Sequence, residues 1–210
     1  TLALKPDRLT HTEAAVIPFG GTTALHFIKK AAILPGKKVL IYGASGAVGS
    51  AAVQLAVHFG ATVTAVCSSA NIDLVKSLGA HHVIDYTNQD FTGNGKKYDV
   101  IFDTVNKVSL SRSLRSLNKR GILILSAAGM SEMVQGFLTS ITSSKKVITG
   151  VTSHSAESIS FLKELIETGK LKPVIDKTYS LGQIAEAHTY VEKGHKKGNV
   201  AVILDLASIE

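Results

Sequence analysis

The stretch KVLIYGASGAVGSAAVQLAVHFGA, residues 38–61, decides the fold of this chain. It opens with a short apolar run at 38–42, continues through closely spaced glycines and ends in an amphipathic segment before Gly60. A continuous apolar run is typical of a parallel strand that is covered on both faces. In the closing segment, apolar residues recur at helical spacing and form one stripe, made of Val48, Ala51, Ala52, Leu55, Ala56 and Phe59. The stretch therefore predicts a strand, a tight turn and a helix.

The same alternation continues along the rest of the chain. Further apolar runs predict strands at 62–67, 82–85, 99–103, 121–125 and 147–150. Further helices are predicted at 22–32, 71–78, 108–117, 156–168 and 181–193. Alternating strands and helices with crossovers of this length predict an α/β fold, a doubly wound parallel sheet with helices on both faces.

The turn after the first strand carries glycines at three-residue spacing: Gly43, Gly46 and Gly49. Glycine lets the backbone turn sharply, lets a pyrophosphate approach, and lets the helix pack closely on the strand. The free N–H groups at the start of the helix favour a bound phosphate. The turn therefore predicts a dinucleotide site of the Rossmann type, with Ser45, Ala47 and Val48 as further contacts. Residues 20–204 are interpreted as the dinucleotide-binding domain, 1–19 as an extended lead-in and 205–210 as a tail.

The end of the second strand indicates which dinucleotide binds. An NAD site usually places an acidic residue there to hold the ribose hydroxyls, whereas this strand ends in Cys67, Ser68 and Ser69. Hydroxyl groups can hydrogen-bond to a 2′-phosphate, which a carboxylate would repel. We therefore expect NADPH rather than NADH, held by Ser68, Ser69 and Asn71, with Tyr86 close by. The two serines can also serve as helix caps, and both roles can hold together.

The composition excludes several other classes of partner. The net charge is +7, but the basic residues are scattered doublets without interleaved aromatic residues, so no nucleic-acid partner is expected. No apolar run reaches the roughly 18–20 residues of a membrane span, so no membrane partner is expected. The single cysteine, Cys67, forms no disulfide framework and no cysteine-rich zinc site, and it is interpreted as a buried strand-end residue. A cytoplasmic location is expected.

With these residues in place, the chain resembles the medium-chain dehydrogenase/reductase superfamily, and most of all its zinc-independent quinone oxidoreductase, zeta-crystallin-like branch. The segments that carry the resemblance are AAVIPFGGTTAL (14–25), LPGKKVLIYGASGAVGSAAVQLA (34–56), SLGAHHVIDY (77–86), YDVIFDTV (98–105) and KGNVAVIL (197–204). The resemblance implies a six-stranded sheet, no bound metal and an NADPH-dependent reduction of a quinone or an α,β-unsaturated carbonyl compound, a small-molecule substrate.

The resemblance also implies further cofactor contacts. Thr23 would approach the nicotinamide end; Val105, Ala127, Ala128 and Gly129 would line the nicotinamide and its ribose; Asn199 would close the phosphate side. In the family, a substrate domain precedes the segment at 14–25. The chain is therefore expected to be a fragment or a truncated product, with weak activity or none.

The residues do not identify a catalytic acid, and other functions remain open. A short-chain dehydrogenase is disfavoured because no tyrosine has a lysine four positions later. A cofactor-binding module without catalysis and an enoyl reductase module of a larger synthase both remain compatible with the sequence. The last strand of the sheet, around 145–151, is expected to be an edge through which two copies can form a homodimer.

Overall fold

The computed structural model describes residues 3–153 and 155–204. Its helices are α1 (His11–Ala15), α2 (Ile17–Lys30), α3 (Ala47–His58), α4 (Ile72–Ser77), α5 (Leu110–Arg115), α6 (Met130–Thr142), α7 (Ala156–Glu167) and α8 (Ile184–Glu192), with short 3-10 turns η1 (Ser69–Asn71), η2 (Phe91–Gly93) and η3 (Leu181–Gln183). Its strands are β1 (Lys38–Tyr42), β2 (Thr62–Cys67), β3 (His82–Asp85), β4 (Tyr98–Asp103), β5 (Leu117–Leu125), β6 (Lys146–Ile148), β7 (Ile175–Ser180) and β8 (Asn199–Ile203).

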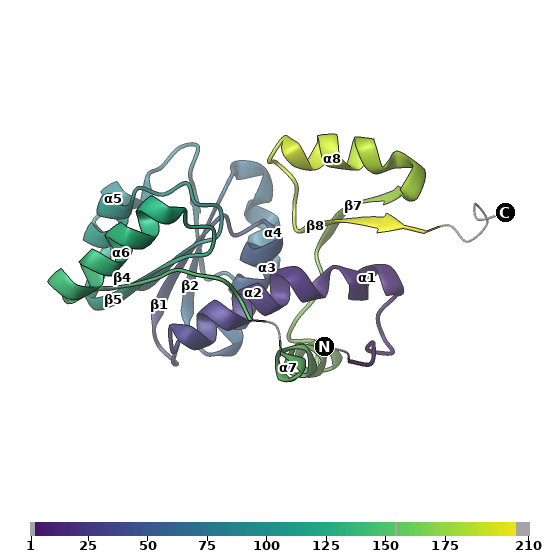
Figure 1. The fold of residues 1–210 in the computed structure, drawn as a ribbon, viewed down its shortest axis with the longest axis horizontal. Helices are drawn as coiled ribbons and strands as arrows, with labels where there is room; N and C mark the ends of the chain where they lie inside the picture. Colours follow the sequence, from purple (N-terminus) through teal and green to yellow (C-terminus); the bar gives the residue numbers. More distant parts are fainter. Residues whose placement is uncertain (1–2, 154, 205–210) are drawn as a thin grey trace.

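Six of these strands form one parallel sheet in the order β3-β2-β1-β4-β5-β6, which confirms the predicted doubly wound fold (Figure 1). The chain adds strands in one direction from β1 to β3 and then returns to the other side of β1 with β4. At such a reversal the loops after β1 and β4 diverge, and they leave a crevice at the carboxyl ends of the strands. The fold therefore places the glycine turn after β1 where open α/β sheets bind their ligands.

The sheet separates two layers of apolar side chains. On one face, β1 contributes Val39 and Ile41 to the larger core, which α2, α3, α4 and α7 cover. On the other face, Leu40 belongs to a smaller core with residues of α5 and with Phe91 of η2. Between β3 and β4 the chain forms the short turn η2 instead of a full helix. Among the described residues, no helix is both long and apolar enough to cross a membrane.

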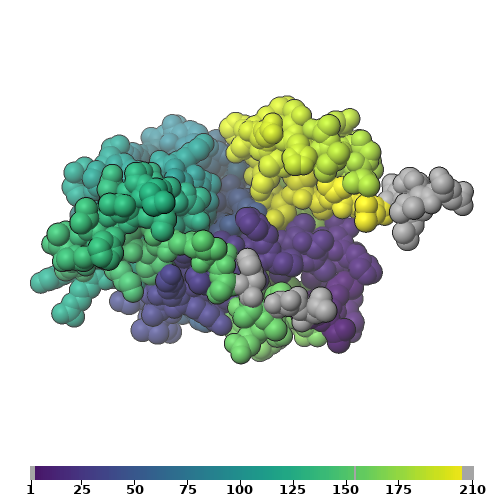
Figure 2. Space-filling model, in the orientation of Figure 1, coloured from purple at the N-terminus to yellow at the C-terminus, as the bar shows by residue number. Residues whose placement is uncertain are grey.

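The C-terminal part of the chain forms a second, smaller unit beside the sheet. β7 and β8 pair in parallel and α8 packs on both strands; Figure 2 shows this part in yellow and light green as a bulge next to the sheet. Just before β8, the Gly198 N–H donates to the Ser45 carbonyl oxygen at 2.7 Å, and Gly198 forms an isolated bridge with Gly46. The C-terminal unit is thereby tied to the glycine turn after β1.

Several element boundaries differ from the sequence expectation. The segment before residue 20 is not simply extended: α1 lies within it, with Thr10 and Glu13 forming a capping box. α2 begins at Ile17 rather than residue 22, because the proline that follows is tolerated in the first turn of a helix. β5 begins at Leu117, four residues earlier than expected, through an irregular stretch that includes Arg120 at φ +62°. The tail at 205–210 lies outside the described residues.

Besides α1, the elements that the apolar pattern does not predict are α6, β7 and β8. β7 carries many polar residues, so it lacks the apolar run of a buried strand, and the segment of β8 carries part of the resemblance without being predicted as a strand. α6 carries an apolar stripe at helical spacing, made of Met130, Met133, Val134, Phe137, Leu138 and Ile141. That stripe was readable in the sequence, but in the structure it faces outward rather than into the core.

Candidate functional site

The turn between β1 and α3 gives each of its glycines a different task. Gly43 has a φ of +77°, a left-handed conformation that side chains with a Cβ rarely adopt. A Cβ on Gly49 would lie 2.1 Å from the Gly43 carbonyl oxygen and 2.8 Å from the Ala44 Cα, so only glycine allows α3 to start this close to β1. Gly46 is the N-cap of α3 and has an extended backbone.

The room around the turn between β1 and α3 shows whether a dinucleotide would fit there. A Cβ on Gly46 would meet only the Gly43 carbonyl oxygen, at 3.5 Å, so the backbone there faces open space. The N–H groups of the first turn of α3 lack carbonyl partners within the helix and carry the positive end of its dipole. An open backbone surface at the N-terminus of a helix, without a side-chain cap, fits the pyrophosphate of a dinucleotide. Ala47 and Val48, predicted as contacts, form this first turn of α3 and are half-buried.

The turn after β2 brings together the residues predicted to hold the 2′-phosphate. Ser68 is half-buried and Ser69 is exposed, whereas Asn71 is only 7% exposed. The Asn71 amide Nδ2 donates to Ser68 Oγ at 3.2 Å and to Ser45 Oγ at 3.0 Å. Asn71 therefore lies deeper in the protein than Ser68 and Ser69, and not beside them at the surface.

A carboxylate that the sequence analysis missed lies next to this turn. Asp85 ends β3, where it is the register partner of Cys67, and its oxygens accept hydrogen bonds from Thr87 and Asn88. The hydroxyl and N–H of Thr87 lower the pKa of Asp85, with smaller contributions from Asn88 and the Ser69 N–H, so the group is ionised at neutral pH. The sequence distance from Ser69 concealed this neighbour, but parallel pairing of β2 with β3 brings their carboxyl ends together.

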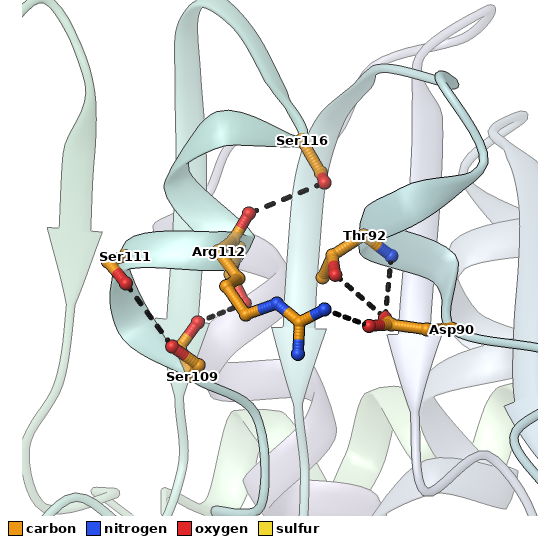
Figure 3. A network of polar contacts seen from close by, with 7 residues as sticks. Asp90, Thr92, Ser109, Ser111, Arg112 and Ser116 are labelled. Atoms are coloured by element: carbon orange, nitrogen blue, oxygen red, sulfur yellow. Dashed lines mark hydrogen bonds and ion pairs between the residues drawn. The ribbon is translucent and has the colours of Figure 1, made fainter.

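Tyr86, which follows β3, is 47% exposed and lies over the end of β1, with its ring centroid 6.2 Å from that of Tyr42. These two rings form part of the wall of a cavity of about 190 Å³ between the η2 loop and the start of α5. Figure 3 shows Arg112 of α5 pointing at Asp90, whose carboxylate it pairs with at 2.5 Å. The ion pair joins the β3–β4 loop to α5 and closes one side of the cavity.

The loop after β4 is held against the glycine turn. The fully buried Asp103 accepts hydrogen bonds from the N–H groups of Val105 and Val108, each at 3.0 Å. The Thr104 hydroxyl donates to the carbonyl oxygens of Tyr42 and Gly43. Val105 lies so close to Gly43 that a Cβ there would come within 2.8 Å of its methyl group. Val105 is thus at the reversal of strand order, where the resemblance places the nicotinamide half.

The remaining predicted contacts occupy several places around the crevice. Thr23 is buried in α2, about one turn after Gly20, whose Cα approaches the Ala47 backbone. Ala127, Ala128 and Gly129 follow β5, and Gly129 is the N-cap of α6. Asn199 directs its amide to the Val174 carbonyl oxygen at 3.1 Å, so it is the Gly198 backbone that contacts the glycine turn after β1. Their contacts with a cofactor stay predictions.

Cys67 and Tyr42 carry ionisable groups near the site, and burial disfavours the ionised form of each. Cys67 is buried at the end of β2; burial, with the Asp85 carboxylate nearby, raises the pKa of its thiol to about 11, which disfavours a thiolate. Burial likewise raises the pKa of Tyr42, with smaller contributions from Asp103, Tyr86 and Asp90. In the described ranges, no three potential metal-ligating side chains of His, Cys, Asp or Glu lie close enough together to hold an ion.

Comparison with known proteins agrees with this geometry. The chain is 37% identical to a chloroplastic quinone-oxidoreductase QR1 of Triphysaria versicolor, over 94% of this chain and 64% of that protein. It is 34% identical to a mitochondrial NAD(P)H oxidoreductase RTN4IP1 of Bos taurus, over 94% of this chain and 57% of that protein. The solved quinone oxidoreductase of Coxiella burnetii superposes with a TM-score of 0.86 at 26% identity, over 95% of this chain and 63% of that one.

Two points follow from these relatives. The chain spans 49–64% of the length of these curated relatives. The expectation of a cytoplasmic location is wrong, because the relatives carry chloroplastic and mitochondrial assignments. The single cysteine therefore does not identify the compartment.

The family is shown by a second, independent match. The sequence pattern of the family described as zinc-binding dehydrogenase matches residues 78–202, more than half of the chain. The matched region begins just after α4 and ends within β8, so it covers β3 to β6 of the parallel sheet and nearly all of the C-terminal unit. Together with the quinone oxidoreductase relatives, it confirms the resemblance: the chain belongs to the zinc-binding dehydrogenase family, in the quinone oxidoreductase-like branch of the medium-chain dehydrogenases/reductases.

Proposed function

We propose that this chain binds NADPH at the carboxyl edge of its sheet, as the cofactor-binding part of an oxidoreductase that reduces a quinone or an α,β-unsaturated carbonyl compound. One observation carries the proposal: the turn from β1 to α3 is filled at Gly43 and Gly49 but open at Gly46, the N-cap of α3, where no side chain caps the start of the helix. The quinone-reducing relatives support the reaction, and the NAD(P)H oxidoreductase relative supports a nicotinamide cofactor.

The preference for NADPH over NADH rests on the turn after β2. Ser68 and Ser69 offer hydroxyl donors at the position where an NAD site usually has a carboxylate. Asp85 lies nearby and is ionised, but its oxygens are engaged by Thr87 and Asn88. Hydrogen bonds to a charged group are each worth about 1.5–3 kcal/mol, so the serines favour the phosphorylated ribose.

The residues of this chain bind and orient the cofactor. When bound, the nicotinamide supplies the hydride that reduces the substrate. Gly46 and the start of α3 would hold the pyrophosphate, Tyr86 would lie beside the adenosine half, and Val105 would lie under the nicotinamide half. Ala127, Ala128, Gly129 and Thr23 are proposed to line the same end. Orientation of this kind converts a two-body reaction into a step within one complex.

A calorimetric titration with NADPH and NADH, run separately, tests the cofactor. We expect NADPH to bind about tenfold more tightly or better, as one additional charge-assisted hydrogen bond predicts. Equal or stronger NADH binding would refute the preference, and binding of neither would refute the site. With phenanthrenequinone added, loss of NADPH absorbance at about one turnover per second or faster would show catalysis by this chain itself.

We further propose that two copies pair through the edge of the sheet. β6 is an edge strand, and its outer backbone groups can pair with a second β6 around a two-fold axis. α6 packs on β6 through Gly136, whose Cα approaches Val147, and it exposes its apolar stripe, as with Phe137 at 67% and Ile141 at 66%. A two-fold axis beside β6 would bring the two stripes together and cover them. A monomeric mass by light scattering at high concentration would refute this.

A further inference from the structure

The side chain of Asn71 joins two turns that are far apart in sequence. Through Nδ2 it reaches Ser45 in the turn after β1, at 3.0 Å, and Ser68 in the turn after β2, at 3.2 Å. Asn71 is itself buried, while both serines are half-buried and border the crevice. The amide therefore lies behind the hydroxyls that a ligand would meet first.

The direction of these hydrogen bonds decides what the serines can offer. An amide nitrogen has two protons, and here both are directed at serine oxygens. Each serine then accepts from Asn71 and keeps its own proton free to donate elsewhere. With the amide reversed, its oxygen would accept the serine protons, and the serines could present only lone pairs. An anion needs donors, so only the first arrangement suits a phosphate.

No third contact fixes the orientation of the amide. Within the described residues, Asn71 Oδ1 is buried and makes no hydrogen bond. Both hydrogen bonds of the amide side chain in the described residues are therefore donated by Nδ2 to serine oxygens, which leaves the serine protons to point away from Asn71. Asn71 and the serines form one unit in which the amide sets the hydroxyl direction.

We propose that Asn71 is a positioning residue that turns the Ser45 and Ser68 hydroxyls outward as donors to two phosphate groups of one ligand. This inference rests on the proposed function: the Ser45 hydroxyl would serve the pyrophosphate and the Ser68 hydroxyl the 2′-phosphate of NADPH. It changes the role of Asn71 from a direct phosphate contact to a residue that acts through two others. Its effect should therefore depend on the serines being present.

A double-mutant cycle measured by calorimetry tests this dependence. We expect Asn71→Ala and Ser68→Ala each to weaken NADPH binding by about tenfold, as loss of one charge-assisted hydrogen bond predicts. In the Ser68→Ala background, the loss caused by Asn71→Ala should be several-fold smaller, because only its effect through Ser45 remains. Independent effects that multiply to about a hundredfold would overturn the proposal. Ser77→Ala, whose hydroxyl bonds only within α4, is the matched control and should bind NADPH like the wild type.

A second variant guards against loss of folding in Asn71→Ala. Asn71→Asp keeps the shape of the side chain but accepts the serine protons. Its added charge repels phosphate whether or not Ser68 is present. The positioning role is therefore tested by comparing the loss of NADPH affinity that Asn71→Asp causes in the two backgrounds, and this loss should be several-fold smaller in the Ser68→Ala background than in the wild type. An equal loss in both backgrounds would overturn the proposal. The melting temperature of each variant checks that it is folded.

The ligand series separates this proposal from the proposed function. NADH lacks the 2′-phosphate, so its affinity should show coupling between Asn71 and Ser45 but not between Asn71 and Ser68. If the wild type binds both nucleotides equally, the NADPH preference fails, while coupling to Ser45 still decides the positioning role. If the wild type binds NADPH but Asn71 couples to neither serine, only the positioning role fails. If it binds neither nucleotide, both proposals fail.

Discussion

Replacing Gly49 by alanine should destabilise the fold through one close backbone contact. The new Cβ would lie 2.1 Å from the Gly43 carbonyl oxygen, whereas ordinary van der Waals contact begins near 3.4 Å. The obstacle is backbone on both sides, including the Ala44 Cα at 2.8 Å, so no flexible side chain can move aside. α3 must therefore shift away from β1 by roughly 1 Å, which loosens the packing between them.

The magnitude follows from two opposing effects. Alanine is better than glycine inside a helix by about 0.5–1 kcal/mol. Overpacking of a closely packed site costs about 1–3 kcal/mol, and a clash with backbone belongs at the upper end. The net expectation is a loss of about 2 kcal/mol in the free energy of unfolding, which lowers the melting temperature by roughly 4–8 °C for a chain of this size.

Gly46→Ala is the matched control, because the same methyl group there meets only one atom, at 3.5 Å. Its melting temperature should stay within about 3 °C of the wild type, since loss of a glycine N-cap costs less than about 1 kcal/mol. Its NADPH affinity should nevertheless fall at least about tenfold, because the methyl group occupies space that the pyrophosphate needs. Thermal melts followed by circular dichroism give the comparison. A Gly49→Ala variant as stable as the wild type would refute this account of the turn.

Three further predictions concern charged and apolar side chains. Asp85→Asn removes a negative charge beside Ser69 and should tighten NADPH binding by about two- to fivefold more than NADH binding, measured by calorimetry. Asp99 is partly buried, which alone would raise its pKa, but the Lys38 N–H, Asn118 and nearby lysines lower its pKa overall. Its carboxylate therefore stabilises the fold above about pH 4 and loses this effect as the pH falls further, so urea denaturation of Asp99→Asn should show less loss of stability in acid than the wild type. Phe137→Glu places a charge in the exposed stripe of α6 and should give a monomer by light scattering.

Each of these predictions has a control and a contrary outcome. Asp73→Asn changes an exposed carboxylate on α4 and should alter neither the nucleotide preference nor the acid dependence. If Asp85→Asn leaves both affinities unchanged, the 2′-phosphate does not lie at Ser69. If Asp99→Asn loses as much stability in acid as the wild type, the hydrogen bonds at the start of β1 do not set the acid response. Gln135→Glu adds the same charge on α6 but outside its apolar stripe. If both changes disrupt the dimer, the stripe is not the surface that holds the two copies together.

The sheet could be predicted because its signals are local. Each strand from β1 to β4 is a short run of apolar residues bounded by turns, and the strand-turn-helix order alone restricts the connections to a parallel sheet. The glycine turn was equally readable, since the tasks of Gly43 and Gly49 depend on backbone geometry within a few residues. α6 shows the limit of the pattern: its stripe predicts a helix but not which side of the helix is covered.

The parts that could not be predicted depend on pairing between distant segments. Asp85 reaches the serines after β2 only because β3 pairs beside β2. Asn71 was expected to contact the ligand, and no local signal shows that its amide would reach back to Ser45. The pairing of β7 with β8 likewise joins a largely polar segment to an apolar one that follows only after α8. Such contacts follow from tertiary packing, which a single sequence does not reveal.

The hydrogen bond from Gly198 to Ser45 has a consequence for how the protein is made. Ser45 lies in the first turn of the sheet, whereas Gly198 is synthesised only after all the strands of that sheet. During translation from the N-terminus, the sheet can assemble while the turn after β1 is still missing its C-terminal neighbour. The ribosome therefore completes the sheet before it completes the segment that contacts the turn after β1, and a chain that stalls late in synthesis would have a formed sheet with an open turn.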